Sequence, residues 1–107
     1  MARISKDQDV VTLINVFTVA PENQQRLVDL LVEATEAVMS RLPGYVSASI
    51  HKSLDGSRVT NYAQWRSRED FEAMLRNPEA APHMQAAAKL ATFEPHLYQV
   101  AYTHDAD

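Results

Sequence analysis

One segment of the chain combines an amide with the only tryptophan: Asn61-Tyr62-Ala63-Gln64-Trp65. In a β-strand the side chains alternate between two faces, so Asn61, Ala63 and Trp65 would share one face. That face is too polar for a plain core and too apolar for a surface exposed to water. An apolar wall that carries a few hydrogen-bonding groups is typical of a small-molecule site. The structural alternative is that Trp65 anchors the core and Asn61 bonds to nearby backbone.

A second amide lies in the β-rich run Val10–Val19, where Asn15 and Phe17 fall on the same face. Asparagine is disfavoured within strands, so two of them in one sheet need an explanation. We therefore interpret Asn15 and Asn61 as polar groups that converge on one cavity. Phe17 and Trp65 would form the walls of that cavity.

Clear breaks divide the rest of the chain into predicted strands and helices. Runs rich in β-branched and aromatic residues predict four strands, at 10–19, 45–53, 58–66 and 94–103. Apolar residues at helical spacing predict one long helix at 22–41. A cap at Ser67, a break at Asn77-Pro78 and the helix-forming run Ala86-Ala87-Ala88 predict a second helical region in two pieces, at 67–76 and 79–90. Pro43-Gly44 ends the long helix.

Turn and capping residues support these boundaries. Asp55-Gly56 lies between two β-rich runs, which is a strong signal for a hairpin. Ser67 followed by Asp70 resembles a capping box, in which the first side chain binds the backbone N–H three residues later.

The resulting order, β-α-β-β-α-β, predicts a ferredoxin-like α+β fold with one antiparallel sheet and both helical regions on one face. In that topology the first and third strands are central neighbours, which would bring Asn15 and Asn61 together. The last predicted strand carries apolar and aromatic residues on both faces, so the second face of the sheet should also be covered. A homodimer in which two sheets pack face to face would cover it.

Length and composition set further limits. A chain of 107 residues predicts a single domain, 1–107, with its core at about 10–103. The net charge of −4 and the lack of a basic stripe argue against a nucleic-acid partner. The absence of cysteine excludes disulfides and thiolate metal sites. No apolar run approaches the roughly 18 residues that would cross a membrane. Residues 1–9 lack the apolar stretch of a secretion signal, so we expect a cytoplasmic protein.

The strand at 61–65, followed by Ser67-Arg68-Glu69-Asp70-Phe71, resembles the corresponding segment of the antibiotic biosynthesis monooxygenase family. The resemblance also includes 43–48 and Asp55-Gly56, and it extends from Val10 to about Tyr102. It implies a dimeric α/β barrel with a cavity between sheet and helices in each subunit. It also implies that the last strand helps to join the subunits.

Several family members that this sequence resembles oxidise tricyclic anthrones to quinones with O₂, without flavin, haem or metal. The deprotonated substrate is an electron-rich enolate that can itself reduce O₂, so the protein must only exclude water and hold the oxygens. The resemblance implies that Asn61 binds the oxyanion, Trp65 orients substrate and peroxide, and Asn15 assists. The expected partners are a small aromatic substrate and O₂, with no cofactor and no metal. The chain has two glycines and no nucleotide-binding glycine motif, which agrees with this expectation.

The proton-handling residues depart from the family pattern. Phe71 stands where the best-known anthrone oxygenases have a tyrosine, and His83-Met84 lies near the place of an arginine. His83 could act as the base, because histidine exchanges protons near neutral pH. Alternatively, it is an inert residue at a helix start. The substrate-binding candidates are Phe17, Phe71, Met74, His83 and Met84, although methionines more often only fill a core.

Two other functions remain open from the sequence. Haem-degrading monooxygenases of the same fold use an asparagine on the first strand, a histidine ligand and a tryptophan in the second helical region. Asn15 and His83 fall near the first two, but Met74 stands near the position of the third. The other possibility is a non-oxidative polyketide cyclase or a small-molecule binding protein.

Overall fold

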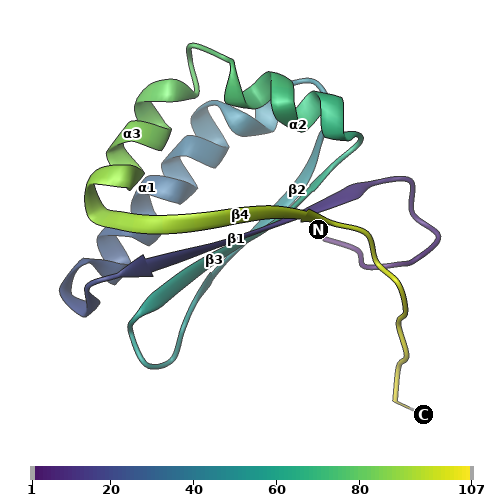
Figure 1. The fold of residues 1–107 in the computed structure, drawn as a ribbon, viewed down its shortest axis with the longest axis horizontal. Helices are drawn as coiled ribbons and strands as arrows, with labels where there is room; N and C mark the ends of the chain where they lie inside the picture. The colour runs from purple at the N-terminus through teal and green to yellow at the C-terminus, as the bar shows by residue number, and fades with distance from the viewer. Residues whose placement is uncertain (1, 107) are drawn as a thin grey trace.

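The computed structural model describes residues 2–106 and shows a layer of helices on one face of an antiparallel sheet (Figure 1). The elements in chain order are β1 (Val11–Val19), α1 (Gln24–Ala37), β2 (Tyr45–Lys52), β3 (Arg58–Trp65), α2 (Arg68–Leu75), α3 (Ala81–Leu90) and β4 (Ala91–Tyr98). Short 3₁₀ turns, Pro21–Asn23 and Met39–Arg41, flank α1. The strand order is β2-β3-β1-β4, which confirms the ferredoxin-like α+β fold.

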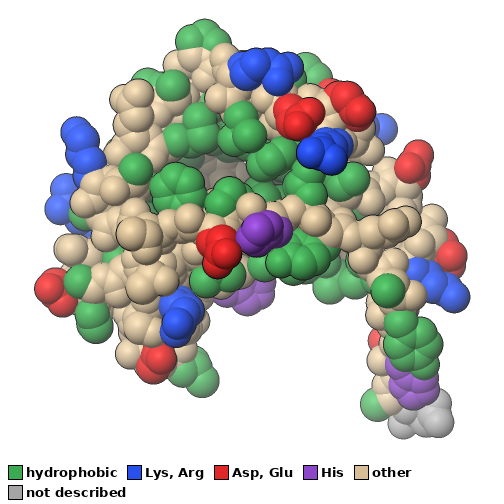
Figure 2. Space-filling view, viewed as in Figure 1, with side chains coloured by type: hydrophobic (Ala, Val, Ile, Leu, Met, Phe, Trp, Pro, Cys, Tyr) green, Lys and Arg blue, Asp and Glu red, His purple; other side chains and the backbone are tan. Residues whose placement is uncertain are grey.

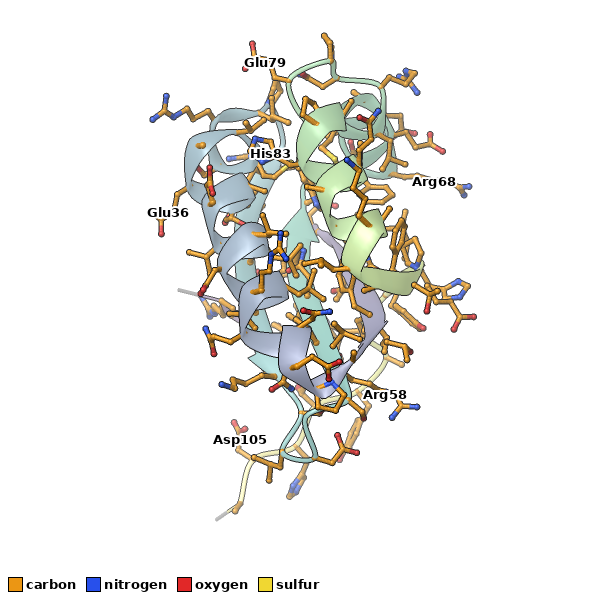
Figure 3. The ribbon with its side chains drawn as sticks, turned by 90° about the vertical axis from the view of Figure 1, so that its left-hand side faces the viewer. Glu36, Arg58, Arg68, Glu79, His83 and Asp105 are labelled. Carbon is orange, nitrogen blue, oxygen red and sulfur yellow. The ribbon has the colours of Figure 1, made fainter. Side chains whose placement is uncertain are left out.

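The pairing of the central strands brings the two asparagines together. β1 and β3 are antiparallel neighbours, as predicted, and Asn15 lies directly opposite Asn61. β4 pairs with the other side of β1, where Pro95 lies opposite Asn15. Proline cannot donate to a strand ladder, and it is tolerated here because β4 is an edge strand. Figure 3 shows α1 and α3 side by side over the sheet.

The predicted position of the last strand, 94–103, is wrong. β4 begins at Ala91, directly where α3 ends, and it ends at Tyr98. The sequence prediction leaves residues 91–93 between the helix and the strand. Thr92 and Phe93 are residue types that favour strands, however, and both pair with β1. Residues 99–106 have no regular secondary structure, and they project away from the domain (Figure 1).

The long helix predicted at 22–41 is shorter than expected. α1 ends at Ala37, and Val38 leaves the helical conformation with a φ of −128°. Val38 is buried in the core, so tertiary packing of this β-branched residue outweighs the continuing helical pattern. The chain then turns through Met39–Arg41 before β2.

The predicted cap of α2 is confirmed. The Ser67 hydroxyl accepts a hydrogen bond from the Asp70 backbone N–H at 3.1 Å, and it also lies 3.1 Å from an Asp70 carboxylate oxygen. Gly44, with a φ of +85°, packs so closely on Asp70 that an added Cβ would overlap that side chain. The start of α2 is therefore fixed against the segment that precedes β2. From this helix Phe71 and Met74 point into the core.

The predicted hairpin between β2 and β3 is also present. The Asp55 carboxylate accepts hydrogen bonds from the Ser57 backbone N–H at 2.9 Å, from the Ser57 hydroxyl at 2.7 Å and from the Ser53 hydroxyl at 2.8 Å. These bonds stabilise the charged carboxylate, the largest contribution coming from the Ser57 backbone, and they lower the pKa of Asp55 to about 2. Gly56 supplies the positive φ, +83°, that the turn needs.

The apolar core is divided into two clusters. The buried members of the Trp65 cluster are Leu13, Val38, Ala63, Trp65, Phe71, Met74 and Ala80. Those of the Phe17 cluster are Phe17, Val19, Leu27, Val59 and Ala87. Along β1 and β3 the pair Asn15 and Asn61 lies between these clusters, so the core is interrupted at the middle of the sheet.

The face of the sheet opposite the helices is covered only at one end. There Gln64, with 1% of its surface exposed, receives a hydrogen bond from the Ser47 hydroxyl at 2.8 Å and donates to the backbone carbonyl of Arg3. The N-terminal segment is thereby held against the sheet. Elsewhere on this face Ile14 and Val16 are only half-buried. Within residues 2–106, no helix combines the length and the apolar character needed to span a membrane.

Candidate active site

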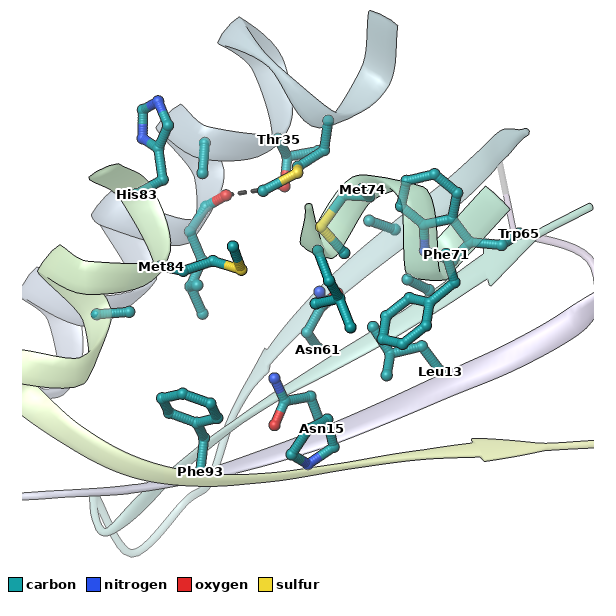
Figure 4. A pocket seen from close by; sticks show the side chains of 18 of the residues that line it. Leu13, Asn15, Thr35, Asn61, Trp65, Phe71, Met74, His83, Met84 and Phe93 are labelled. Atoms are coloured by element: carbon teal, nitrogen blue, oxygen red, sulfur yellow. Dashed lines mark hydrogen bonds between the residues drawn. The ribbon is translucent and has the colours of Figure 1, made fainter. Parts of the chain in front are cut away.

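A cavity lies between the sheet and the helices, at the interruption of the core (Figure 4). The volume within which the centre of a water molecule can move is about 120 Å³. A single bound water needs only about 10–15 Å³ of such volume. Every residue that the sequence analysis selected lines this cavity: Asn15, Phe17, Asn61, Trp65, Phe71, Met74, His83 and Met84. The fold therefore brings all the sequence-predicted candidates together.

The two amides form the polar centre of the cavity. They project side by side from β1 and β3, because Asn15 and Asn61 are paired residues on the face of the sheet that the helices cover (Figure 4). The side-chain oxygen of each amide is buried, and among residues 2–106 it has no hydrogen-bond partner. Each amide therefore has unused hydrogen-bonding capacity.

Trp65 lies at one end of the cavity. Its side chain is 2% exposed and contacts two aromatic rings edge to face, Tyr45 at a centroid distance of 5.8 Å and Phe71 at 6.3 Å. The indole N–H is also buried and finds no acceptor in the part of the chain that the structure describes. Trp65 thus anchors the core, as the structural alternative held, and it also presents a free donor.

These three unpaired atoms carry an energetic cost. Leaving one buried polar group without a partner costs about 1–3 kcal/mol, and such groups are rare in folded proteins. Asn15, Asn61 and Trp65 all lie in one cavity, and apolar side chains form most of its remaining wall. An arrangement of this kind is complementary to a flat ligand with hydroxyl groups that donate to the two amide oxygens and an oxygen that accepts from the indole N–H.

His83 and Met84 reach the cavity from the first turns of α3. In Figure 4 the Met84 thioether points toward the centre of the cavity, whereas the His83 ring turns away from the amides. His83 is therefore a wall residue at the outer end of the cavity, without direct contact with Asn15 or Asn61. Met74 reaches the centre from α2, on the side of Trp65 (Figure 4).

Several residues that line the cavity were not predicted as site residues from the sequence. Leu31 and Thr35 come from the face of α1 that turns to the sheet, and their spacing of four was a usable signal. Tyr45 lies opposite Trp65 in the strand register, and burial raises the pKa of its phenol. Phe93 was missed because the last strand was placed three residues too late.

Within residues 2–106, no group of three or more histidine, aspartate or glutamate side chains lies close enough together to hold a metal ion.

Comparisons with known proteins identify the family of this chain. Residues 10–90 match the family described as Antibiotic biosynthesis monooxygenase. Tetracenomycin-F1 monooxygenase from Streptomyces glaucescens is 45% identical over 106 residues, which cover 99% of this chain and 95% of that protein.

Two solved structures of oxygenases share the fold. SnoaB, a cofactor-independent oxygenase from Streptomyces nogalater, superposes with a TM-score of 0.75 at 30% identity, covering 90% of this chain and 97% of that one. A monooxygenase from the gene ActVA-Orf6 of Streptomyces coelicolor, solved with the ligand nanaomycin D, gives a TM-score of 0.81 at 25% identity. That superposition covers 91% of this chain and 92% of the other. The chain therefore belongs to the antibiotic biosynthesis monooxygenase family and is a monooxygenase.

Proposed function

We propose that this protein oxidises a phenolic, polycyclic substrate of the anthrone type to a quinone with O₂, without a cofactor. The observation that carries the proposal is the set of three buried, unpaired polar atoms, on Asn15, Asn61 and Trp65, in an otherwise apolar cavity. Similarity to the tetracenomycin F1 monooxygenase and to the cofactor-independent oxygenase SnoaB supports it.

The reaction needs little from the protein because the substrate supplies the electrons. Loss of one proton from the reactive carbon gives an enolate, and this enolate transfers an electron to O₂. The two radicals combine to a peroxide anion, which takes back the proton removed in the first step, and the resulting hydroperoxide loses water to leave the quinone. One oxygen atom of O₂ ends in the product and the other in water, and two hydrogens leave the carbon.

The cavity side chains have separate roles in this scheme. The Asn61 amide N–H and the Trp65 indole N–H donate to the substrate oxyanion, where preorganised donors in a dry site act most strongly. The buried oxygens of Asn15 and Asn61 accept hydrogen bonds from the phenolic hydroxyl groups, so that Asn15 assists beside Asn61 and fixes the orientation of the ring. The apolar walls, formed by Phe17, Phe71, Met74 and Met84, hold the flat rings and keep water from the peroxide.

His83 is our candidate for the proton acceptor. It is the imidazole that lines the cavity, and its ring turns away from the amides, so a water molecule would carry the proton between substrate and ring. Phe71 has no hydroxyl group for this purpose.

Oxygen consumption with dithranol, a 1,8-dihydroxyanthrone, tests the proposal directly. We expect chelator-treated protein to consume one O₂ per dithranol and to form the anthraquinone faster than the uncatalysed background. Asn61→Ala should lower kcat by about 10²–10³, the usual effect of losing an oxyanion donor. Trp65→Phe removes the indole N–H and keeps an aromatic wall, so it should lower kcat and leave binding largely intact.

The same samples separate the other functions. Hemin binding with a Soret shift, together with no oxygen uptake, would indicate haem degradation instead. Dithranol binding without uptake would leave a cyclase or a binding protein as the better description.

We also propose that two copies of this chain form a homodimer through the open face of the sheet. Ile14 and Val16 face outward there, uncovered by any helix. Residues 99–106 project from the domain and carry Tyr102 with 72% of its surface exposed (Figure 1). A second copy would bury both features, and the resemblance of the sequence to dimeric family members supports this occupant.

A further inference from the structure

The cavity opens on the side of β4. Figure 2 shows a hollow beneath the helices, in the region where β4 runs below α2 and α3 in Figure 1, and hydrophobic side chains surround it. Pro95 and Phe93 are the β4 residues that line the cavity. A ligand that enters there would pass the edge of the sheet before it reaches the amides.

Phe93 holds an unusual position at this opening. On its inner side it packs against Phe17, with the ring centroids 5.5 Å apart and the planes inclined by 45°. Phe17 is 4% exposed, whereas Phe93 is 44% exposed although it lines the cavity. The exposed part of the Phe93 ring is therefore free to contact a ligand that enters at this edge of the sheet.

Aromatic side chains of the cavity lie on both sides of the two amides. In Figure 4, Trp65 and Phe71 lie on one side of Asn15 and Asn61, and Phe93 lies on the other. Phe93 pairs with Phe17, which lies two residues along β1 from Asn15. Two residues of a strand span about 7 Å. A flat ligand held by its oxygens at the amides therefore extends toward both aromatic groups.

We propose that Phe93 is a specificity-determining residue that stacks on the ring of the substrate farthest from Trp65. This inference deepens the proposed function: the reactive carbon lies in an interior ring, and Phe93 selects substrates that have a further fused ring on the side of the opening. Phe93 touches no reacting atom, so it acts on binding and leaves the chemical step unchanged. Aromatic contacts of this kind change affinity by about threefold to tenfold.

The test compares Phe93→Ala, Phe93→Leu and Phe93→Tyr with wild-type protein on phenolic ligands of two, three and four fused rings. Trp65 is the only tryptophan of the chain and lies in the cavity, so quenching of its fluorescence reports binding without turnover. We expect the Kd and KM for the three- and four-ring ligands to rise about threefold to tenfold in Phe93→Ala and Phe93→Leu. The two-ring ligand should be unaffected, kcat should stay within about twofold, and Phe93→Tyr, which keeps an aromatic ring and leaves Trp65 the only tryptophan, should keep the wild-type affinity.

Val46→Ala is the matched control, since Val46 is an exposed apolar residue, 39% accessible, on the opposite edge strand and outside the cavity lining. An equal loss of affinity for ligands of every size, a fall in kcat at constant KM, or a change of oligomeric state without a change in Kd would overturn the role of Phe93. If no variant, wild type included, consumes O₂, the proposed function fails. The size dependence of binding still tests Phe93 in that case.

Discussion

Asn15, Asn61 and Trp65 show how single residues can depart from the preferences of the fold. A central strand favours β-branched or aromatic residues, and a core favours apolar ones, but two amides occupy the middle of this sheet. Their oxygens lack partners within residues 2–106, which lowers the stability of the ligand-free protein. Sites that bind ligands commonly trade stability in this way.

A substitution at Asn15 should reveal this trade. Asn15→Leu replaces an unpaired amide with an apolar side chain of similar size, so we expect the free energy of unfolding to rise by about 1 kcal/mol while oxygenase activity falls. Gln64→Leu is the matched control on the other face, where the amide is fully bonded to Ser47 and Arg3. This control should lose about 1–3 kcal/mol.

Chemical denaturation of both variants beside wild type measures these changes. An equal loss of stability in the two variants would mean that the Asn15 amide is satisfied in solution. The unpaired amides would then no longer support a ligand site.

At the scale of elements, contacts at the N-terminal end of α2 fix the position of this helix. The Ser67 cap and the close packing of Gly44 on Asp70 fix this end of the helix, and Phe71 follows directly in the cavity wall. The sequence predicted the cap because capping is local. It could not predict the contact with Gly44, which joins residues that are 26 positions apart in the chain (70 − 44 = 26).

Gly44→Ala and Gly56→Ala form a matched pair that tests this contact. Both glycines have a φ near +85°, so each alanine should cost about 1–2 kcal/mol of stability from backbone strain. At Gly56 the new Cβ would meet only Pro21, at an ordinary 3.6 Å, whereas at Gly44 it would overlap Asp70. We therefore expect Gly44→Ala to lose about 1–3 kcal/mol more than Gly56→Ala, as overpacking does. It should also raise KM, because α2 must move.

Thermal and urea unfolding, with dithranol kinetics on the same samples, give both quantities. Equal destabilisation and unchanged KM in the two variants would show that the Asp70 side chain gives way without moving the helix.

At the scale of the whole molecule, the two faces of the sheet are covered differently. The helices cover one face and enclose the cavity, whereas on the other face, among residues 2–106, only the N-terminal segment covers a part. The open face and the projecting residues 99–106 are the basis for the proposed homodimer.

Sedimentation equilibrium tests the proposed dimer. We expect a mass of twice the 12.0 kDa of one chain. Val16→Asp should give a monomer, because a charge on the half-buried face costs too much to bury in an interface. Val32→Asp, at a 38% exposed position on α1, is the control and should leave the mass unchanged. A monomeric wild type, or dissociation by Val32→Asp instead, would contradict the assignment of this face.

The sequence by itself determined the order of the elements, the central pairing of β1 and β3, and the face that carries Asn15, Phe17, Asn61 and Trp65. These features follow from local rules, since alternation along a strand assigns each side chain to a face and turn residues mark the breaks. The wall residues Met74 and His83 were instead selected by their positions in the resemblance to the family, because no local rule assigns them to the cavity.

Only the tertiary structure decided where the core is interrupted, which polar atoms remain unpaired and where the cavity opens. The boundary between α3 and β4 is an example: the strand residues Ala91 to Phe93 are defined by pairing with β1, and no local signal separates them from the helix. Val38 is another, because its burial ends α1. Such features depend on contacts between residues far apart in the chain, and for that reason Phe93 emerged only when the strands were assembled.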